Sequence, residues 1–138
     1  MKPNELRIGN LILHDKDIVN VTQIINMNGY CINGIGLNGY THYGNVSNYF
    51  KPIPLNEEML LKLGFEVRES SVCKEYYIGL NDITHDWLFS ITWLEKPELI
   101  NAPNAPFYRN GKHTIYYVHQ LQNLYFALTG EELDISNI

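Results

Sequence analysis

The sequence predicts an α+β fold made mainly of antiparallel β-hairpins or a meander, with a small N-terminal β unit, one short middle helix and one C-terminal helix. Three observations predict it. Apolar residues alternate with a period of two along several segments, Asn-Gly pairs recur between apolar stretches, and two segments repeat apolar residues at helical spacing. Consecutive strands joined by short turns pair antiparallel, because a parallel pair needs a long crossover.

The first segment predicts a β-hairpin. Residues 10–14 and 18–25 are rich in Val, Ile and Leu, and the His-Asp-Lys-Asp sequence at residues 14–17 has the composition of a turn. Short strands that open a chain in this way are common in small SH3-like barrels, which is an analogy of fold and not of function.

Residues 28–44 hold half of the chain's ten glycines and three Asn-Gly pairs, which start at residues 28, 33 and 38. Asn-Gly favours tight hairpin turns, because both residues tolerate a positive φ. We therefore expect a meander or loop that displays aromatic side chains.

Pro52 and Pro54 predict a break in the β structure, because proline has no N–H to donate within a central strand. We expect one domain over residues 1–138, with a candidate seam near residues 51–55. The seam would separate an N-terminal β unit from a C-terminal β-α unit.

Residues 56–65 predict the short middle helix. Asn56 has the side chain of an N-cap, and Glu57 lies in the first turn, where the helix dipole favours negative charge. Gly64 is the expected left-handed stop.

Strands and a further helix are predicted in the C-terminal half. Residues 75–80 and 87–94 carry apolar side chains at every second position, and the Asn-Gly pair within residues 107–114 predicts a two-residue hairpin. Residues 118–129 predict the C-terminal helix, followed by a loosely held tail over residues 131–138. The buried face of this helix is expected to consist of Val118, Leu121, Tyr125 and Leu128.

The overall charge limits the partners. A formal net charge of −5 and a pI near 5.4 argue against a duplex nucleic acid, which needs clustered basic residues. Cys31 and Cys73 share no motif, so we expect two reduced thiols. Neither a signal peptide nor a run of apolar residues long enough for a membrane span is present, so we expect a soluble, cytoplasmic protein.

The motifs that would indicate a cofactor or catalysis are weak. Residues 34–39 spell GxGxxG, but the Gly- and Tyr-rich sequence that follows has no helical period, so the glycines are better explained by turns. The five histidines lack zinc-ligand spacing, and no nucleophile motif is present. We therefore assign no catalytic residue, no metal site and no cofactor.

The best candidate for a ligand site is a surface rich in tyrosine and histidine, with two basic residues of the hairpin predicted within residues 107–114; whether residues 28–49 and 107–114 form one site stays open. Tyrosine rings offer a large contact area and stack on bases, while Arg or Lys can hold a phosphate. The alternative, that several of these tyrosines complete the core, stays open. The candidate residues are Tyr40, His42, Tyr43, Tyr49, Tyr108, Arg109 and Lys112.

A second candidate surface lies on the C-terminal helix, away from its apolar face. A flat polar and aromatic face could contact another subunit or a host protein, or it could pack under the proline-rich loop that precedes the second hairpin. The candidate residues for an oligomer or partner interface are His119, Gln122, Asn123 and Phe126.

Three segments resemble a family of small uncharacterised proteins of gut anaerobic bacteria and their prophages or phages. They are ELRIGN at residues 5–10, PIPL leading into LLKLGF at 52–65, and YVHQLQNLYFALTGEEL at 117–133. The resemblance implies an accessory role on mobile or phage DNA. It implies no activity and no catalytic residues.

We therefore expect a non-enzymatic binding protein of phage or mobile-element origin. The sharpest hypothesis is an anti-defence protein, acting as a homo-oligomer, that sequesters a small nucleotide-like signalling molecule in a pocket joining aromatic and basic side chains. An adaptor or inhibitor of a host protein would instead expose an apolar patch. A small enzyme of unknown reaction would gather polar groups with shifted pKa values.

Overall fold

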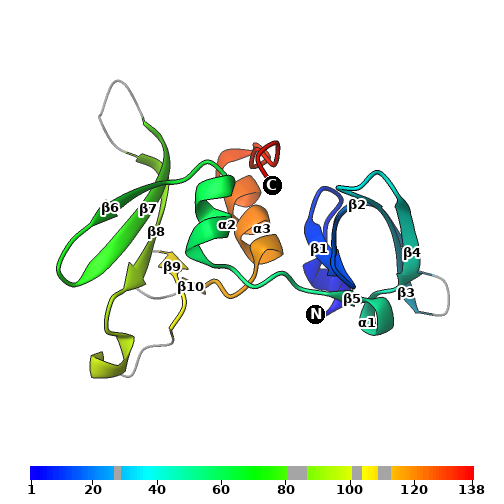
Figure 1. The fold of residues 1–138 in the computed structure, drawn as a ribbon, viewed down its shortest axis with the longest axis horizontal. Helices are drawn as coiled ribbons and strands as arrows, with labels where there is room; N and C mark the ends of the chain where they lie inside the picture. Colours follow the sequence, from blue (N-terminus) through cyan, green and yellow to red (C-terminus); the bar gives the residue numbers. More distant parts are fainter. Residues whose placement is uncertain (27–28, 81–86, 101–103, 109–112) are drawn as a thin grey trace. The chain divides into compact units, whose positions relative to one another are not determined.

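The computed structural model describes the backbone of residues 1–26, 29–80, 87–100, 104–108 and 113–138 (Figure 1). The chain forms two compact units. Unit 1 comprises residues 1–54 and 117–127, and unit 2 comprises residues 55–116 and 128–138. The chain first passes from unit 1 to unit 2 between Pro54 and Leu55. This point lies next to Pro52 and Pro54, where the sequence predicts a break in the β structure.

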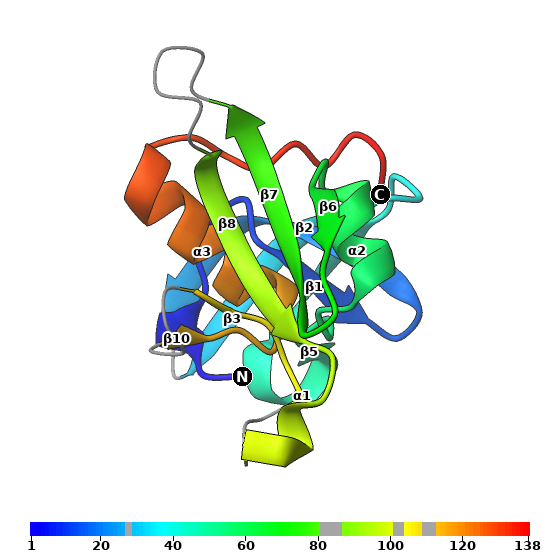
Figure 2. The same ribbon diagram turned by 90° about the vertical axis from the view of Figure 1, so that its left-hand side faces the viewer.

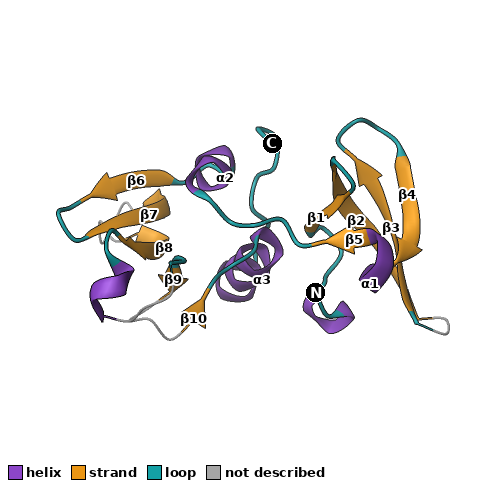
Figure 3. Ribbon diagram, turned by 60° about the horizontal axis from the view of Figure 1, so that its bottom comes forward, coloured by secondary structure: helices purple, strands orange, loops and turns teal. Residues whose placement is uncertain are grey.

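Unit 1 contains a five-stranded antiparallel sheet in the order β4-β3-β2-β1-β5 (Figure 3). The chain runs as a meander through the first four strands, and a short helix returns it to pair β5 with β1. The elements are a 3-10 turn at Pro3–Glu5, β1 Leu11–His14, β2 Asp17–Asn26, β3 Tyr30–Gly36, β4 Thr41–Asn45, α1 Val46–Tyr49 and β5 Phe50–Lys51.

The expected N-terminal hairpin is confirmed, with β1 and β2 joined through a turn in which Asp15 has a φ of 53°. Asn38-Gly39 also forms a turn, with a φ of 85° at Gly39. The turn expected at Asn33-Gly34 is wrong, because both residues lie inside β3. A Cβ on Gly34 would overlap the Val19 side chain and lie 2.8 Å from the Asn20 carbonyl oxygen, so this glycine permits close strand packing instead.

The core of unit 1 is an apolar cluster under the sheet. Its members come from four strands, from α1 and from the N-terminal segment, which explains why the alternating pattern predicted strands here. The buried side chains are Leu6, Ile12, Val19, Val21, Ile32, Val46 and Phe50.

The predicted C-terminal helix is confirmed as α3, Val118–Thr129, whose residues 118–127 belong to unit 1. Val118 and Leu121 are fully buried, as expected from the helical period. Leu128 is 51% exposed, so the buried face does not extend to the last turn as predicted. Gly130, with a φ of 76°, follows the helix as its expected stop.

Unit 2 contains a second antiparallel sheet of five strands, in the order β10-β9-β8-β7-β6; β6, β7 and β8 face the viewer in Figure 2. The predicted hairpin within residues 107–114 is represented by the pairing of β9 with β10, while its central residues 109–112 lie outside the described part of the chain. The elements are α2 Glu57–Lys62, β6 Glu66–Glu69, β7 Cys73–Leu80, β8 Trp87–Leu94, a 3-10 turn at Pro97–Ile100, β9 Phe107–Tyr108 and β10 His113–Thr114.

The signals at both ends of α2 act as the sequence predicts. The Asn56 side chain accepts a hydrogen bond of 2.8 Å from the Met59 N–H. Gly64 has a φ of 85°, and the Phe65 N–H donates to the Leu60 carbonyl at 3.1 Å.

The core of unit 2 contains alternate residues of its two long strands, including Tyr76, Phe89 and Ile91. The tail is held more firmly than expected, because Leu133 is only 4% exposed. β6 is a strand that the alternation did not predict, since its sequence is EVRE and three of its four residues are exposed. In the described part of the chain, no helix is long and apolar enough to cross a membrane.

Candidate functional site

The predicted ligand residues are divided between the two units and the residues outside the described part of the chain. Tyr40 and Tyr43 belong to unit 1 and are 72% and 62% exposed. Tyr108 belongs to unit 2, where its ring stacks on Phe89 with centroids 5.3 Å apart. The two basic residues predicted to hold a phosphate, Arg109 and Lys112, lie outside the described residues.

Tyr43 and Tyr49 lie on opposite faces of β4. Side chains alternate along a strand, so the Tyr43 side chain points to one face of β4. The His42 side chain, and the position that a side chain at Gly44 would take, lie on the other face. A Cβ on Gly44 would lie 2.8 Å from Cδ2 of Tyr49, which places the Tyr49 ring against this second face. The tyrosines of residues 40–49 therefore do not form a single stacking platform.

His42 is engaged inside unit 1. Its Nε2 lies 2.7 Å from Oδ2 of Asp17, and its ring centroid lies 4.6 Å from that of His14. The His14 ring in turn contacts Phe50, with centroids 5.1 Å apart. Among the described residues, no group of three or more His, Cys, Asp or Glu side chains is arranged to hold a metal ion.

The residues predicted as a partner interface on α3 are used within unit 1. His119 and Gln122 are 0% and 1% exposed, so the expectation that they lie outside the buried face is wrong. The Gln122 Oε1 accepts a hydrogen bond of 2.8 Å from the Leu11 N–H, and its Nε2 donates to the Gly9 carbonyl at 3.1 Å. A polar side chain can be buried here because it pairs with backbone groups that the sheet leaves unbonded.

Asn123 and Phe126 complete this contact with the N-terminal segment. Asn123 Oδ1 accepts hydrogen bonds from Asn10 Nδ2 at 2.9 Å and from Arg7 Nε at 3.3 Å, and its Nδ2 donates to the Glu5 carbonyl at 2.7 Å. The Arg7 guanidinium carbon lies 4.0 Å from the centroid of the Phe126 ring. Residues 5–10 and the C-terminal helix therefore bind each other, although Asn10 and Asn123 are 113 residues apart in the sequence.

His119 is the exception in this buried set. Neither ring nitrogen has a hydrogen-bond partner among the residues that the structure describes, and the ring stacks on Tyr117 with centroids 5.8 Å apart. Burial lowers the pKa of His119 below its usual value, an effect partly opposed by the negative charge of Glu5.

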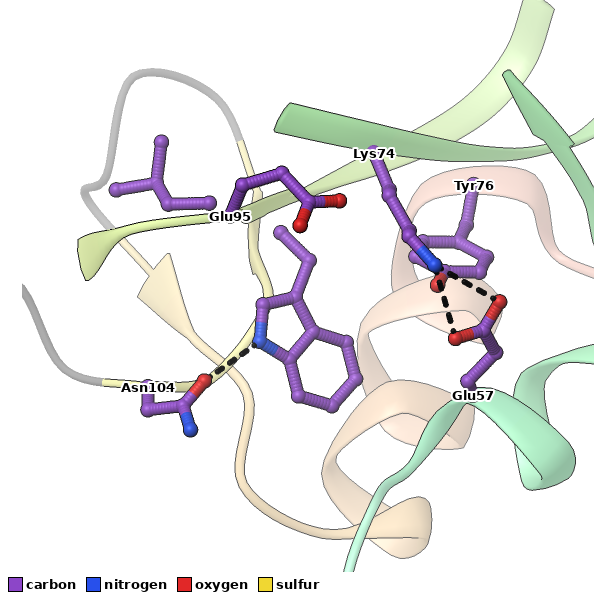
Figure 4. A pocket seen from close by; sticks show the side chains of 7 residues that line it. Glu57, Lys74, Tyr76, Glu95 and Asn104 are labelled. Atoms are coloured by element: carbon purple, nitrogen blue, oxygen red, sulfur yellow. Dashed lines mark hydrogen bonds and ion pairs between the residues drawn. The ribbon is translucent and has the colours of Figure 1, made fainter. Parts of the chain in front are cut away.

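Unit 2 contains an open pocket of about 210 Å³ between the start of α2 and the ends of β7 and β8 (Figure 4). Figure 4 shows the Lys74 ammonium pointing towards the Glu57 carboxylate, next to the Tyr76 ring. The pocket is lined by Glu57, Lys74, Tyr76, Trp93, Leu94, Glu95 and Asn104.

Lys74 is held by two carboxylates. Its Nζ lies 3.2 and 3.4 Å from the two oxygens of Glu57 and 3.2 Å from Oε1 of Glu69. Hydrogen bonds to Glu69 and then to Glu57 raise the pKa of Lys74 above its usual value. Lys74 therefore stays a cation at any pH at which the protein is expected to work.

The aromatic walls of the pocket are fixed in orientation. Trp93 Nε1 donates a hydrogen bond of 3.0 Å to Oδ1 of Asn104, and the Trp93 and Tyr76 ring systems are 6.4 Å apart and inclined at 59°. Tyr76 is only 1% exposed. Burial, followed by the nearby charge of Glu57, raises the pKa of Tyr76 to about 12.

Sequence analysis missed this pocket. Glu57 was explained by the helix dipole, Trp93 and Tyr76 were assigned only to strand faces, and Lys74 carried no signal. Lys74 and Glu57 are 17 residues apart, and only the fold brings them together. The alternation of residues 87–94 predicts which face of the strand Trp93 occupies, and no local pattern indicates the pocket.

The pocket offers both donors and acceptors of hydrogen bonds. A protonated Lys74 and a protonated Tyr76 are donors, and the carboxylates of Glu57 and Glu95 are acceptors. Comparison with protein-family models, with curated proteins and with solved structures found no match to this chain.

Proposed function

We propose that the protein is a non-enzymatic binding protein whose ligand site is the unit 2 pocket beside Trp93. The observation that supports this most directly is the geometry of the pocket. The Lys74 ammonium is paired with Glu57 and Glu69, and the Trp93 indole is held by its hydrogen bond to Asn104. The raised pKa values of Lys74 and Tyr76 agree with this, because both shifts stabilise the protonated form. The fixed indole and the ion-paired lysine suit a preorganised binding surface.

The charges favour a ligand with a cationic group or with amino groups on a planar ring. Glu57, Glu69 and Glu95 place three carboxylates at or next to the pocket, against the single ammonium of Lys74. Glu95 is exposed and makes no ion pair with the described residues, so its carboxylate is available to a ligand. Aromatic faces also attract cations, whereas a phosphate would be repelled.

Native mass spectrometry of the full-length protein purified from its host, before and after denaturation, tests this proposal. We expect a small molecule or peptide that is released on unfolding and is lost from the Glu95→Gln variant. Glu95→Gln is suitable because an exposed side chain can be changed without disturbing the fold.

Tyr43→Ala in unit 1 is the control, since it removes another exposed side chain from the other unit. It should retain the ligand. A protein without any ligand, or one that retains its ligand in Glu95→Gln but loses it in Tyr43→Ala, would overturn the proposal.

A second candidate function is sequestration of a nucleotide-like molecule, consistent with an anti-defence role in phage. The exposed rings of Tyr40 and Tyr43 favour it, because exposed tyrosines stack on bases. Its phosphate clamp would depend on Arg109 and Lys112. If the double Arg109→Ala, Lys112→Ala variant binds cyclic dinucleotides as tightly as the unchanged protein, this assignment is wrong.

A further inference from the structure

The outward face of the unit 1 sheet carries no charge along β2, β3 and β4. Gln23, Asn33 and Tyr43 are direct neighbours across these strands, so their side chains point to the same side. The only Asp, Glu, Lys, Arg or His residues in the three strands are Asp17 and His42, which pair with each other on the opposite side. We call this surface the neutral face, and it includes Gln23, Cys31, Asn33, Ile35, Thr41 and Tyr43.

The outward face of the unit 2 sheet shows that a lack of charge is not general in this protein. Arg68 of β6 is opposite Glu75 of β7, and Glu66 of β6 points to the same side. This is the side away from the buried Phe89 and Ile91. A partner of the neutral face, in contrast, cannot be held by ion pairs, which argues against a phosphate backbone.

The neutral face is open to solvent and offers an aromatic ring. Tyr43 and Ile35 are 62% and 49% exposed. A hydrogen bond between Tyr43 and the Cys31 thiol is the main cause that raises the pKa of Tyr43 above its usual value. Cys31 is the diagonal neighbour of Tyr43 on β3, so the Tyr43 ring extends across the sheet and presents a flat surface.

Amide side chains lie next to this ring and are held in place. Asn33 Nδ2 donates a hydrogen bond of 2.8 Å to Gln23 Oε1. A carboxamide has two N–H donors and an oxygen that can accept two hydrogen bonds. The Gln23 and Asn33 pair therefore retains both donors and acceptors for a ligand.

This combination of groups suits a neutral sugar. A sugar hydroxyl donates and accepts at once, as a carboxamide does, and the C–H bonds of a sugar ring can pack on an aromatic face, which is the negative part of the ring. A protein partner fits less well, because it would bury these amides and lose affinity wherever one was left unpaired.

We propose that the neutral face binds a neutral carbohydrate chain, with a sugar ring packed on Tyr43 and hydroxyl groups hydrogen bonded to Gln23 and Asn33. Three adjacent strands span roughly 10 Å, so several sugars of one chain can contact the face. The site belongs to unit 1 and is independent of the pocket proposed in unit 2.

Isothermal titration calorimetry of the full-length protein tests the proposal. The probes are cellohexaose, xylohexaose and mannohexaose, the corresponding disaccharides, and hexagalacturonic acid as a charged chain. We expect at least one neutral hexasaccharide to bind, and its disaccharide to bind about tenfold more weakly because it covers less of the face. Hexagalacturonic acid should not bind, because the neutral face has no cation to pair with its carboxylates.

Variants assign the binding to the neutral face. Tyr43→Ala should weaken it by at least about tenfold, because the packing surface for the sugar ring is lost. Tyr43→Phe keeps the ring and should bind nearly as well as the unchanged protein. Gln23→Ala should weaken binding by roughly two- to tenfold, the effect of one lost hydrogen bond. Tyr49→Ala is the matched control, because Tyr49 is 58% exposed but lies against the other face of β4, and it should change nothing.

Three results would overturn the proposal. The first is that none of the neutral hexasaccharides binds. The second is that a hexasaccharide binds equally well to Tyr43→Ala and to the unchanged protein. The third is that analytical ultracentrifugation shows a dimer that Tyr43→Ala converts to a monomer, since a second copy of the chain would then occupy the face.

Discussion

Units 1 and 2 each contain a five-stranded antiparallel sheet, but they use their interior polar side chains in opposite ways. In unit 1, Gln122 and Asn123 of α3 are hydrogen bonded to backbone groups near the N-terminus. In unit 2, Lys74, Glu57 and the Trp93 indole lie around an open pocket. Polar side chains that form hydrogen bonds with buried backbone groups stabilise the fold. Polar side chains that are held beside an open cavity can still contact a ligand.

The two units also differ in how far apart in the sequence the joined segments lie. In unit 1, residues 5–10 and 117–126 bind each other through hydrogen bonds and the contact of Arg7 with Phe126, which closes the unit. The pocket of unit 2 takes Lys74 and Trp93 from the middle of the chain.

Removing a core side chain from unit 1 should have the largest effect on stability. Leu121 is fully buried, and we expect Leu121→Ala to lower the free energy of unfolding by about 2–5 kcal/mol, because it loses apolar contacts and leaves a cavity. Chemical denaturation measures this value. Leu128→Ala, on the exposed side of the same helix, should change it by less than about 0.5 kcal/mol; equal losses would contradict the assigned buried face of α3.

Breaking the polar closure of unit 1 should have the next largest effect. Gln122→Ala would leave the Leu11 N–H and the Gly9 carbonyl without their partner in a buried place, at a cost of about 1–3 kcal/mol. Hydrogen exchange at the Leu11 amide should also be faster in the Gln122→Ala variant. Gln23→Ala, at an exposed position of β2, is the control, and a similar loss there would argue against a structural role for Gln122.

The stability of unit 1 should decrease at mildly acidic pH because of His119. Its pKa in the folded protein is lower than the usual value of 6.5, so the unfolded chain takes up a proton first as the pH falls. This contribution is complete above about pH 6.5 and is lost as the pH falls towards the folded pKa. Denaturation at pH 7.5 and pH 5.5 measures it, and the decrease should shrink in His119→Phe. An equal decrease in stability in the unchanged protein and in His119→Phe would show that other groups cause it.

A smaller, local effect should mark the unit 2 pocket. Tyr76 should titrate at about pH 12, and Glu57→Gln should lower this pKa, because it removes the negative charge that opposes ionisation of the phenol. Carbon-13 NMR of the labelled tyrosine rings follows the titration. The pKa of Tyr43 in unit 1 should be the same in the Glu57→Gln variant. An unchanged pKa of Tyr76 in this variant would contradict the described pocket.

Local signals predicted the secondary structure well. The Asn56 cap, the Gly64 stop and the range of α3 were correct, because each depends on hydrogen bonds and side-chain spacing within a few residues. Asn33-Gly34 was misassigned for a related reason. The Asn-Gly pair also fits a position within a strand that a neighbouring strand approaches closely. The local sequence does not show that β2 lies against Gly34.

The candidate site could not be predicted in the same way. The tyrosines of residues 40–49 were correctly expected to be displayed, yet the alternation of β4 separates Tyr43 from Tyr49. His119 and Gln122 were placed on the wrong side of α3, because their polarity suggested exposure and their burial depends on what packs against the helix.

The sequence by itself determined the fold class, the ends of α2 and α3 and most strands of this protein, but not α1, since these features follow from periodicity and from the preferences of neighbouring residues. The tertiary structure alone decided which polar side chains close the fold and which line a pocket. Gln122 meets Leu11 across 111 residues, and Lys74 meets Glu57 across 17. Such contacts depend on the packing of distant segments, for which local patterns hold no information.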